Sequence, residues 1–371
     1  IDKARGASML QTDLQEVYRS AFQGAGETLY VRRWYIPPAK IDEKAQSLTP
    51  VDDASGEGVT DDAIGVIIEH VMHNGGDVIF LPEEIMGEAM SQLHKEDPVT
   101  WRRSEIIVST KIFWGGVGVN ERGLSRKHIN EGLDASLERL KVNYVDLLFC
   151  HRPDPFTPTE TVVRAMTDII RSGRATAWGT SEWSAQQITE AYWLAALHGL
   201  EPPQIEQPQY NMLKRDRFEN EYHPLYQNPY QIGTTIWSPL ASGILTGKYN
   251  NGIPEGSRLT QNGYEFLRDV LEQHKEKGNI EKIVKLADYA SSKLGCSMAE
   301  LALAWCVKNK NVSTVLLGIT KPEQLEENIG CLSVLENLTS EHMEDIDKIL
   351  DNKPEPYAGF GGAGMRQIVT I

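Results

Sequence analysis

Cysteine and long apolar runs are both scarce in this chain, and each scarcity excludes a class of protein. The 371 residues include four cysteines with no Cys-x-x-Cys spacing, which argues against a disulfide framework and against a zinc or other metal site. No apolar stretch approaches the roughly 18 residues that a membrane span requires. The first residues, IDKARGASMLQTDL, lack the apolar core of a signal peptide. We therefore expect a cytoplasmic protein without membrane insertion.

Positive charge is also in deficit. The chain has 37 lysines and arginines against 52 aspartates and glutamates, a formal net charge of −15. Such a surface repels phosphate backbones and anionic lipid headgroups, so no nucleic-acid partner is expected. Hydrophobic residues make up 40% of the chain, which is enough to bury the core of one large or two ordinary domains.

From residue 105 onward, short apolar runs alternate with amphipathic stretches. The predicted strands are IIVSTKI (106–112), YVDLLFCH (144–151), ATAWGTS (175–181), QIEQPQY (204–210), TTIWSPL (234–240) and TVLLG (314–318). After the first of them, Ile129, Leu133, Leu137 and Leu140 share one helical face. This alternation indicates parallel strands covered by helices, in either a doubly wound sheet or a (β/α)8 barrel.

The position of the polar residues favours the barrel. Six of them lie at or just after the carboxyl end of a predicted strand, where a barrel builds its active site: Lys111, His151, Ser181, Gln207, Ser238 and Thr320. No Gly-x-Gly-x-x-Gly follows any strand, so the dinucleotide motif of a doubly wound sheet is missing. We predict an α/β protein with a (β/α)8 TIM barrel at residues 61–355, a poorly patterned segment at 1–60 and a flexible glycine-rich tail at 356–371. Residues 62–73 are predicted as a helix and 77–81 as a strand.

Local signals predict some helix ends and some core residues. Thr157 with Glu160, and Ser184 with Gln187, have the spacing of capping boxes. Four tryptophans are predicted to pack between helices and barrel: Trp178, Trp183, Trp193 and Trp305.

Six segments resemble the aldo-keto reductases, and more narrowly the branch that contains voltage-gated potassium channel β subunits. They are WRRSEIIVSTKIFWGG, ERGLSRKHINEGLDASLERL, YVDLLFCHRPDP, WGTSEWSAQQI, TIWSPLASGILTGKY and LLGITKPEQLEENIG, and the resemblance covers about residues 100–355. It implies a (β/α)8 barrel that binds NADP(H) across its carboxyl-terminal face and passes hydride to the carbonyl carbon of a small aldehyde or ketone.

The family uses an Asp, Tyr, Lys and His set, and the resemblance assigns two of these roles. Lys111 in STKIF and His151 in FCHRPD match the catalytic Lys and His. Trp114, which follows Lys111 closely in the chain, is a candidate wall of the substrate pocket. From the residues alone, a lysine at an apolar strand end facing a barrel mouth must be partnered or have a shifted pKa.

The Asp and Tyr of the set are not found. The family carries a segment resembling FDTAEVYxxGxAE after its second strand, whereas here HNGGDVIF runs directly into LPEEIMGEAM. No tyrosine lies between Tyr35 and Tyr144, Phe80 stands where the Asp is expected, and Asp77 comes three positions too early. Three interpretations remain open: a cofactor-binding pseudo-enzyme, a replacement such as Tyr30 or Tyr35, or a divergent or defective N-terminal segment.

The resemblance also implies a set of cofactor-binding positions. Ser181 and Gln207 match residues that bind the nicotinamide carboxamide, and Glu182 stands beside them where the β subunits tend to have Arg. The residues along the pyrophosphate are Trp237, Ser238, Pro239, Leu240, Ala241 and Ser242, with Lys248 and Arg258 near the phosphates. The adenine and ribose side has Gly318, Thr320, Gln324, Glu327 and Asn328. Thr320 and Glu323 have capping-box spacing, and a helix start suits the 2′-phosphate of NADP over NAD.

Two functions remain open. One is an NADP(H)-dependent oxidoreductase, which His151 favours because channel β subunits tend to have Asn there. The other is an NADP(H)-binding regulatory subunit of a channel with little or no turnover, which the missing Asp and Tyr favour. The resemblance also allows a homotetramer.

Overall fold

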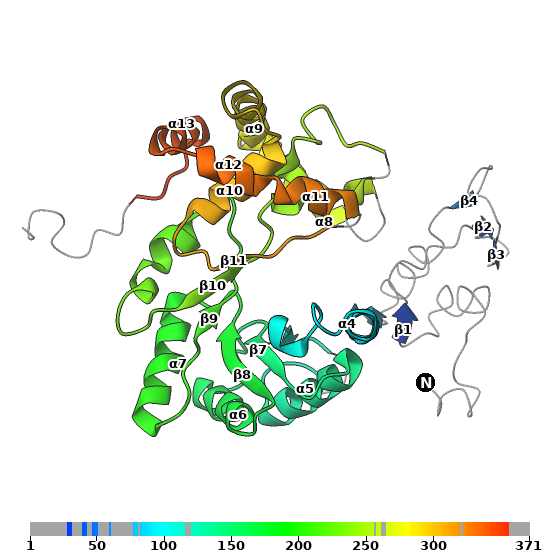
Figure 1. Cartoon of the computed structure of the whole chain (residues 1–371), viewed down its shortest axis with the longest axis vertical. Coiled ribbons are helices and arrows are strands. Elements are labelled where there is room, and N and C mark those ends of the chain that lie inside the picture. The colour runs from blue at the N-terminus through cyan, green and yellow to red at the C-terminus, as the bar shows by residue number, and fades with distance from the viewer. Residues whose placement is uncertain are drawn as a thin grey trace, which may run out of the picture. The chain divides into compact units, whose positions relative to one another are not determined.

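The structure, a computed structural model, describes ten stretches of the chain (Figure 1). They are residues 28–31, 39–42, 47–50, 59–60, 77–80, 82–115, 120–255, 257–260, 265–319 and 322–355. The chain divides into two compact units, of which the first contains residues 1–105, 138–142 and 255–269 and the second contains the rest. The helix predicted at residues 62–73 and the tail at 356–371 lie outside the described residues, as does most of segment 1–60.

The first unit holds short strands and one long helix. Strand β1 (Thr28–Val31) pairs in parallel with β5 (Asp77–Phe80), so that Tyr30 is in register with Ile79. β2 (Ala39–Asp42) pairs antiparallel with both β3 (Ser47–Pro50) and β4 (Val59–Thr60). The described residues of this unit also include helix α4 (Pro82–Glu96), η1 (Arg103–Glu105) and η5 (Arg258–Thr260). The strand predicted at 77–81 is confirmed as β5.

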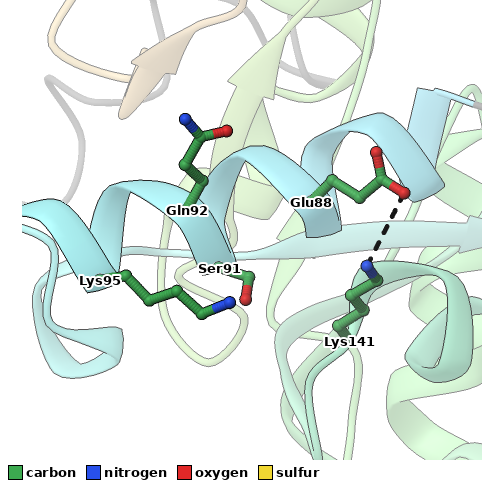
Figure 2. Close-up of a pocket in the computed structure, with 5 residues that line it drawn as sticks. All are labelled: Glu88, Ser91, Gln92, Lys95 and Lys141. Atoms are coloured by element: carbon green, nitrogen blue, oxygen red, sulfur yellow. Dashed lines mark ion pairs between the residues drawn. The ribbon is translucent and has the colours of Figure 1, made fainter.

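Helix α4 lies directly on residues 139–141. A Cβ at Gly87 would stand 2.4 Å from the carbonyl oxygen of Arg139, which is too close for any side chain, so this contact requires glycine. The Arg139 guanidinium pairs with Glu83 at 2.6 Å. Beside this contact is a surface pocket lined by Glu88, Ser91, Gln92, Lys95 and Lys141, in which Lys141 points toward Glu88 with an N–O distance of 3.8 Å (Figure 2). None of the residues predicted to form the site lines this pocket.

The second unit is built on a parallel sheet with the strand order β11-β10-β9-β8-β7-β6. These strands are β6 (Ser109–Ile112), β7 (Val145–Cys150), β8 (Ala175–Thr180), β9 (Ile205–Glu206), β10 (Gly233–Ile236) and β11 (Thr314–Val315). They alternate with α5 (Arg126–Leu140), α6 (Thr159–Arg171) and α7 (Ala185–His198). The sheet curls into half of a barrel, and Figure 1 shows these three helices along its outer side. The α/β class with parallel (β/α)8 strand order is confirmed.

The other helices of the second half of the chain lie between the later strands and after β11. They are η2 (Arg217–Glu221), η3 (His223–Tyr226), η4 (Ala241–Thr246), α8 (Glu265–Glu276), α9 (Asn279–Tyr289), η6 (Ala290–Leu294), α10 (Met298–Lys308), α11 (Pro322–Ile329), α12 (Cys331–Asn337) and α13 (Ser340–Leu350). In α10, Met298, Ala299 and every residue from Leu301 to Cys306 are buried, because this part of the helix is apolar on nearly all sides. Within the described ranges, no helix combines the length and the apolar character needed to cross a bilayer.

The helix starts show where local sequence rules hold. At α7 the Ser184 hydroxyl accepts a hydrogen bond from the Gln187 N–H, and the Gln187 side chain accepts from the Ser184 N–H, as predicted. At α6 the predicted cap is wrong. Pro158 is the residue before the helix, and Thr157 donates its hydroxyl hydrogen to Asp154 at 2.7 Å. Because the helix begins one residue later than predicted, the residue at its N-cap has no side-chain hydroxyl to accept a hydrogen bond from the helix N–H groups.

The core of the second unit is aromatic at its centre. Trp178, Trp183 and Trp305 are at most 3% exposed, and the Tyr210 ring stacks on Trp305 with centroids 5.2 Å apart. The prediction for Trp193 is wrong, because this side chain is 54% exposed on α7. Ile129, Leu133 and Leu140 are buried as their spacing predicts.

Candidate functional site

The residues predicted to carry the chemistry lie on the carboxyl ends of neighbouring strands. Lys111, on β6, is in register with Phe149 of β7. The His151 N–H, just after β7, donates to the Ile112 carbonyl at 3.0 Å, so the ends of these two strands lie side by side. The Ser181 N–H donates to Cys150 at 3.0 Å, and the Gln207 N–H donates to Thr180 at 2.8 Å. Because parallel strands all end at the same edge of a sheet, this ladder brings Lys111, His151, Ser181 and Gln207 to one edge.

Ser181 and Gln207 form a fixed polar pair on this edge. The Ser181 hydroxyl donates to the Gln207 carbonyl at 2.9 Å, and the Gln207 Nε2 donates to the Thr235 hydroxyl at 3.2 Å. The two residues are 1% and 4% exposed. We call this pair the amide shelf, because it presents the Gln207 side-chain amide, which Thr235 holds in one orientation.

Glu182 connects the ends of three strands. Its Oε1 accepts hydrogen bonds from the Gln209 N–H at 2.6 Å and from the Trp237 indole at 3.0 Å, and its Oε2 pairs with Arg217 at 2.9 Å. Its backbone has a φ of 59°, in the left-handed region that few side chains adopt. The Glu182 carboxylate thus braces Trp237 against the neighbouring strand.

The loop after β10 has an unusual backbone. Ser238, Ala241 and Ser242 have φ values of 55°, 47° and 56°, and each such residue costs on the order of 1–3 kcal/mol. The Asn211 amide donates to the Ser238 carbonyl at 2.9 Å, and the Ser242 N–H donates to the Ser238 hydroxyl at 3.3 Å. Strained backbone held by specific hydrogen bonds is typical of a binding loop. Within it Pro239 is buried, whereas Trp237 and Leu240 are partly exposed.

Lys248 returns to this same loop. A Cβ at Gly243 would lie 3.0 Å from the Lys248 Nζ, so the small residue makes room for the lysine. The Lys248 side chain is exposed and its Nζ lies 5.0 Å from the Tyr249 ring centre.

The remaining predicted positions are further along the chain. The Leu316 N–H donates to Ile236 at 2.9 Å, which joins the segment before Gly318 to β10. On α11, Asn328 is 6% exposed and Gln324 is half-buried, whereas Glu327 is exposed. Thr320 lies outside the described residues, and Arg258 begins η5 in the first unit with a side chain that is also outside them.

The environment of His151 keeps its ring neutral. Burial, the Arg152 guanidinium and the Lys111 ammonium together lower the pKa of His151 to about 4. Trp114, which is 60% exposed, meets the His151 ring edge to face with centroids 6.5 Å apart. At pH 7 a neutral imidazole can donate one hydrogen bond through its single N–H, but it carries no second proton to transfer.

Two residues near the site were missed by the sequence analysis. Arg152 follows His151 in the HRPD motif and donates to the Ser181 hydroxyl at 3.3 Å. Glu206 precedes Gln207 and is 1% exposed. It accepts a hydrogen bond from the Thr180 hydroxyl and lies 3.3 Å from the Tyr222 hydroxyl. Burial, together with the nearby Glu182 carboxylate, raises the pKa of Glu206 to about 8. Glu206 is therefore protonated at neutral pH, and its proton can bridge to Tyr222.

The titration of Glu206 predicts a pH-dependent stability. The folded chain keeps a proton on Glu206 that the unfolded chain loses above about pH 4.5. The free energy of unfolding should therefore fall by up to about 1.4 kcal/mol per pH unit from this source between pH 4.5 and pH 8, and level off above. In Glu206→Gln this slope should be lost, so that the variant is the more stable protein at pH 8.5.

Urea unfolding at a series of pH values measures this effect. Glu190→Gln, on the exposed face of α7, is the matched control and should keep the wild-type slope. A Glu206→Gln protein with the unchanged slope would show that the proton is held elsewhere.

Comparison with known proteins places this chain among similar sequences in two ways, by a family model and by individual relatives. A model of the aldo/keto reductase family matches residues 79–351. Two plant proteins, each described as a probable voltage-gated potassium channel subunit beta, are similar over 276 residues. The rice protein (Oryza sativa subsp. japonica) is 50% identical and the Arabidopsis thaliana protein is 49% identical. In both cases the match covers 74% of this chain and 80% of the relative.

Proposed function

The chain belongs to the aldo/keto reductase family, and from this premise we propose that it is an NADP(H)-dependent oxidoreductase that acts on a small aldehyde or ketone in the cytoplasm. The observation that carries the proposal is the position of Lys111 and His151 on neighbouring strand ends beside the amide shelf. Such a row of polar groups at the carboxyl edge of a parallel sheet is where barrel enzymes bind and convert their substrates.

The residues present fit a nicotinamide dinucleotide. The Gln207 amide can both donate to and accept from a carboxamide, and its hydrogen bond to Thr235 fixes its orientation. Lys248, which is exposed beside the loop from Trp237 to Ser242, offers a cation to phosphate oxygens. The bound cofactor would supply the hydride, and the chain would hold it in place.

Lys111 and His151 would act on the carbonyl oxygen of the substrate. The neutral His151 ring can donate one hydrogen bond to that oxygen, and the Lys111 ammonium stabilises the negative charge that develops there during reduction. The Trp114 indole, next to His151, would form one apolar wall. Hydride addition would leave a negative charge on that oxygen, and the Lys111 ammonium would give it the proton that completes the alcohol, with water returning a proton to the lysine. This division of roles does not require a tyrosine from the segment that the sequence lacks.

A second function is favoured by a different observation. The relatives are described as potassium channel β subunits, and the Asp and Tyr of the family's catalytic set are missing from the sequence. The rival proposal is therefore a homotetrameric NADP(H)-binding subunit that docks on the cytoplasmic face of a channel with little turnover.

One experiment separates the two functions. The full chain is mixed with NADPH and 4-nitrobenzaldehyde, and the loss of NADPH absorbance is followed. Turnover above the uncatalysed rate supports the reductase. Saturable quenching of protein fluorescence by NADPH without turnover supports the regulatory subunit, and the absence of both contradicts the two proposals together.

Selectivity for the 2′-phosphate is a separate prediction. If Lys248 and the start of α11 serve that phosphate, NADPH should bind about ten to a hundred times more tightly than NADH, as expected for charge-assisted hydrogen bonds. The melting temperature should accordingly rise several degrees more with NADPH than with NADH at equal concentration. Lys248→Met should reduce this difference. Equal shifts from the two nucleotides would remove the assignment.

A further inference from the structure

Among the described residues, Arg152 has no acidic partner, unlike the neighbouring Arg217. Its Nη1 donates to the His151 carbonyl and to the Ser181 hydroxyl, and its side chain is half-buried. In the described part of the chain, its Nε and Nη2 groups have no protein acceptor and no carboxylate pairs with it. By contrast, Arg217 pairs with Glu182 and Glu221. A half-buried guanidinium with unused donors is suited to an anion that comes from outside the protein.

The position of Arg152 indicates which anion this is. Arg152 and Lys111 both lie close enough to His151 to lower its pKa, so this strand edge carries two cations in a chain of net charge −15. One cation is sufficient for the oxygen of a carbonyl group. A second, planar donor next to it matches the two oxygens of a carboxylate in a bidentate geometry that a lysine cannot offer.

We propose that Arg152 binds a carboxylate of the substrate, so that the preferred substrates are aldehydes or ketones that carry both an apolar, ring-sized body and a carboxylate group. The Trp114 ring, 60% exposed and edge to face with His151, provides the surface on which the apolar body packs. This inference rests on the proposed reductase function, and it names the substrate class of the same site. Arg152 is a binding residue that leaves the hydride transfer to other groups.

The test compares two ligands that differ in one charge. 4-Carboxybenzaldehyde and its neutral methyl ester, methyl 4-formylbenzoate, are titrated by calorimetry into the full chain, both with and without saturating NADP⁺, which has no hydride to give. The wild type should bind the carboxylate about ten to a hundred times more tightly than the ester. Arg152→Gln should lose this preference and keep its affinity for the ester. Arg152→Lys should keep part of it, and Arg164→Gln, an exposed arginine of α6 paired with Glu160, should keep all of it.

Each other result overturns the inference. Equal affinities in the wild type, a preference that survives in Arg152→Gln, or binding of neither ligand would remove the carboxylate site. If Arg152→Gln instead weakens NADP⁺ itself by more than about threefold, the anion that Arg152 binds is a phosphate of the cofactor. Should Arg152→Gln fail to fold, the titrations of the two ligands into the wild type and into Arg152→Lys still test the carboxylate site. The proposed function fails separately, through the absence of NADPH turnover, because the titrations do not depend on turnover.

Discussion

Lys111→Met should lower kcat for NADPH-dependent reduction of 4-nitrobenzaldehyde by about 10²–10⁴, the usual contribution of a group that stabilises charge or moves a proton in the transition state. The ammonium group lies at the end of β6, close enough to His151 to lower its pKa. Methionine has a similar volume and no charge, so the substitution removes the cation without opening a cavity. KM should change little if Lys111 acts mainly in the transition state.

Two controls accompany this measurement. Lys127→Met removes an exposed cation on α5 that pairs with Glu131, and it should leave kcat unchanged. NADPH affinity should also be the same in Lys111→Met as in the wild type, because the amide shelf and the loop after β10 are not altered. A kcat within threefold of the wild type would show that Lys111 is not part of the chemistry.

The sequence predicts the strands most accurately where they are apolar and lie inside the sheet. The predicted strands at residues 144–151 and 175–181 match β7 and β8 to within a residue at each end, because both are apolar runs buried in the middle of the sheet. The strand predicted at 204–210 is only Ile205–Glu206. Pro208 has no N–H to pair, so the ladder stops and returns as a single bridge between Gln209 and Trp237. The strand predicted at 314–318 is also short, because β11 has a neighbour on one side only among the described strands.

The parts of the site that could not be predicted are those that depend on register. Which strand ends carry polar residues is visible in the sequence, and Lys111, His151, Ser181 and Gln207 are found on one edge as expected. The partner of each side chain is not visible. The contact between Glu182 and Trp237 joins positions 55 residues apart, and that between Arg152 and Ser181 joins positions 29 apart. Such pairs appear only when the strands are aligned.

The structure gives a physical reason for one of the positions at which the chain departs from the family resemblance. Glu182 stands where the β subunits tend to have arginine, and its carboxylate is directed to Gln209, Trp237 and Arg217. Glu182 is among the cofactor-binding positions predicted from the sequence, and its cofactor role remains a prediction. Glu182 can also act indirectly: its hydrogen bond to Trp237 fixes the start of the loop that is proposed to contact the pyrophosphate.

Arg215→Ala should be the most destabilising single substitution outside the site, with a loss of about 3–5 kcal/mol in the free energy of unfolding. The Arg215 side chain is 5% exposed and binds Glu219 through two hydrogen bonds of 2.8 and 2.9 Å. It also binds Asp347 at 2.8 Å, and its guanidinium carbon lies 5.1 Å from the centre of the Trp305 ring. Alanine would leave the two carboxylates partly buried and without this cation, which costs more than the loss of the contacts themselves.

An exposed ion pair serves as the control for this prediction. Lys348 binds Asp345 at 2.9 Å on α13, but its side chain is 72% exposed, so Lys348→Ala should cost at most about 1 kcal/mol. Arg215→Lys keeps the charge and loses the planar fork, and it should fall between the two. Urea unfolding of the three variants tests the order. If Arg215→Ala and Lys348→Ala cost the same, the buried pairs do not hold α13 to the loop that follows β9, and the stability of the second unit must come from the apolar core around Trp305 and Tyr210.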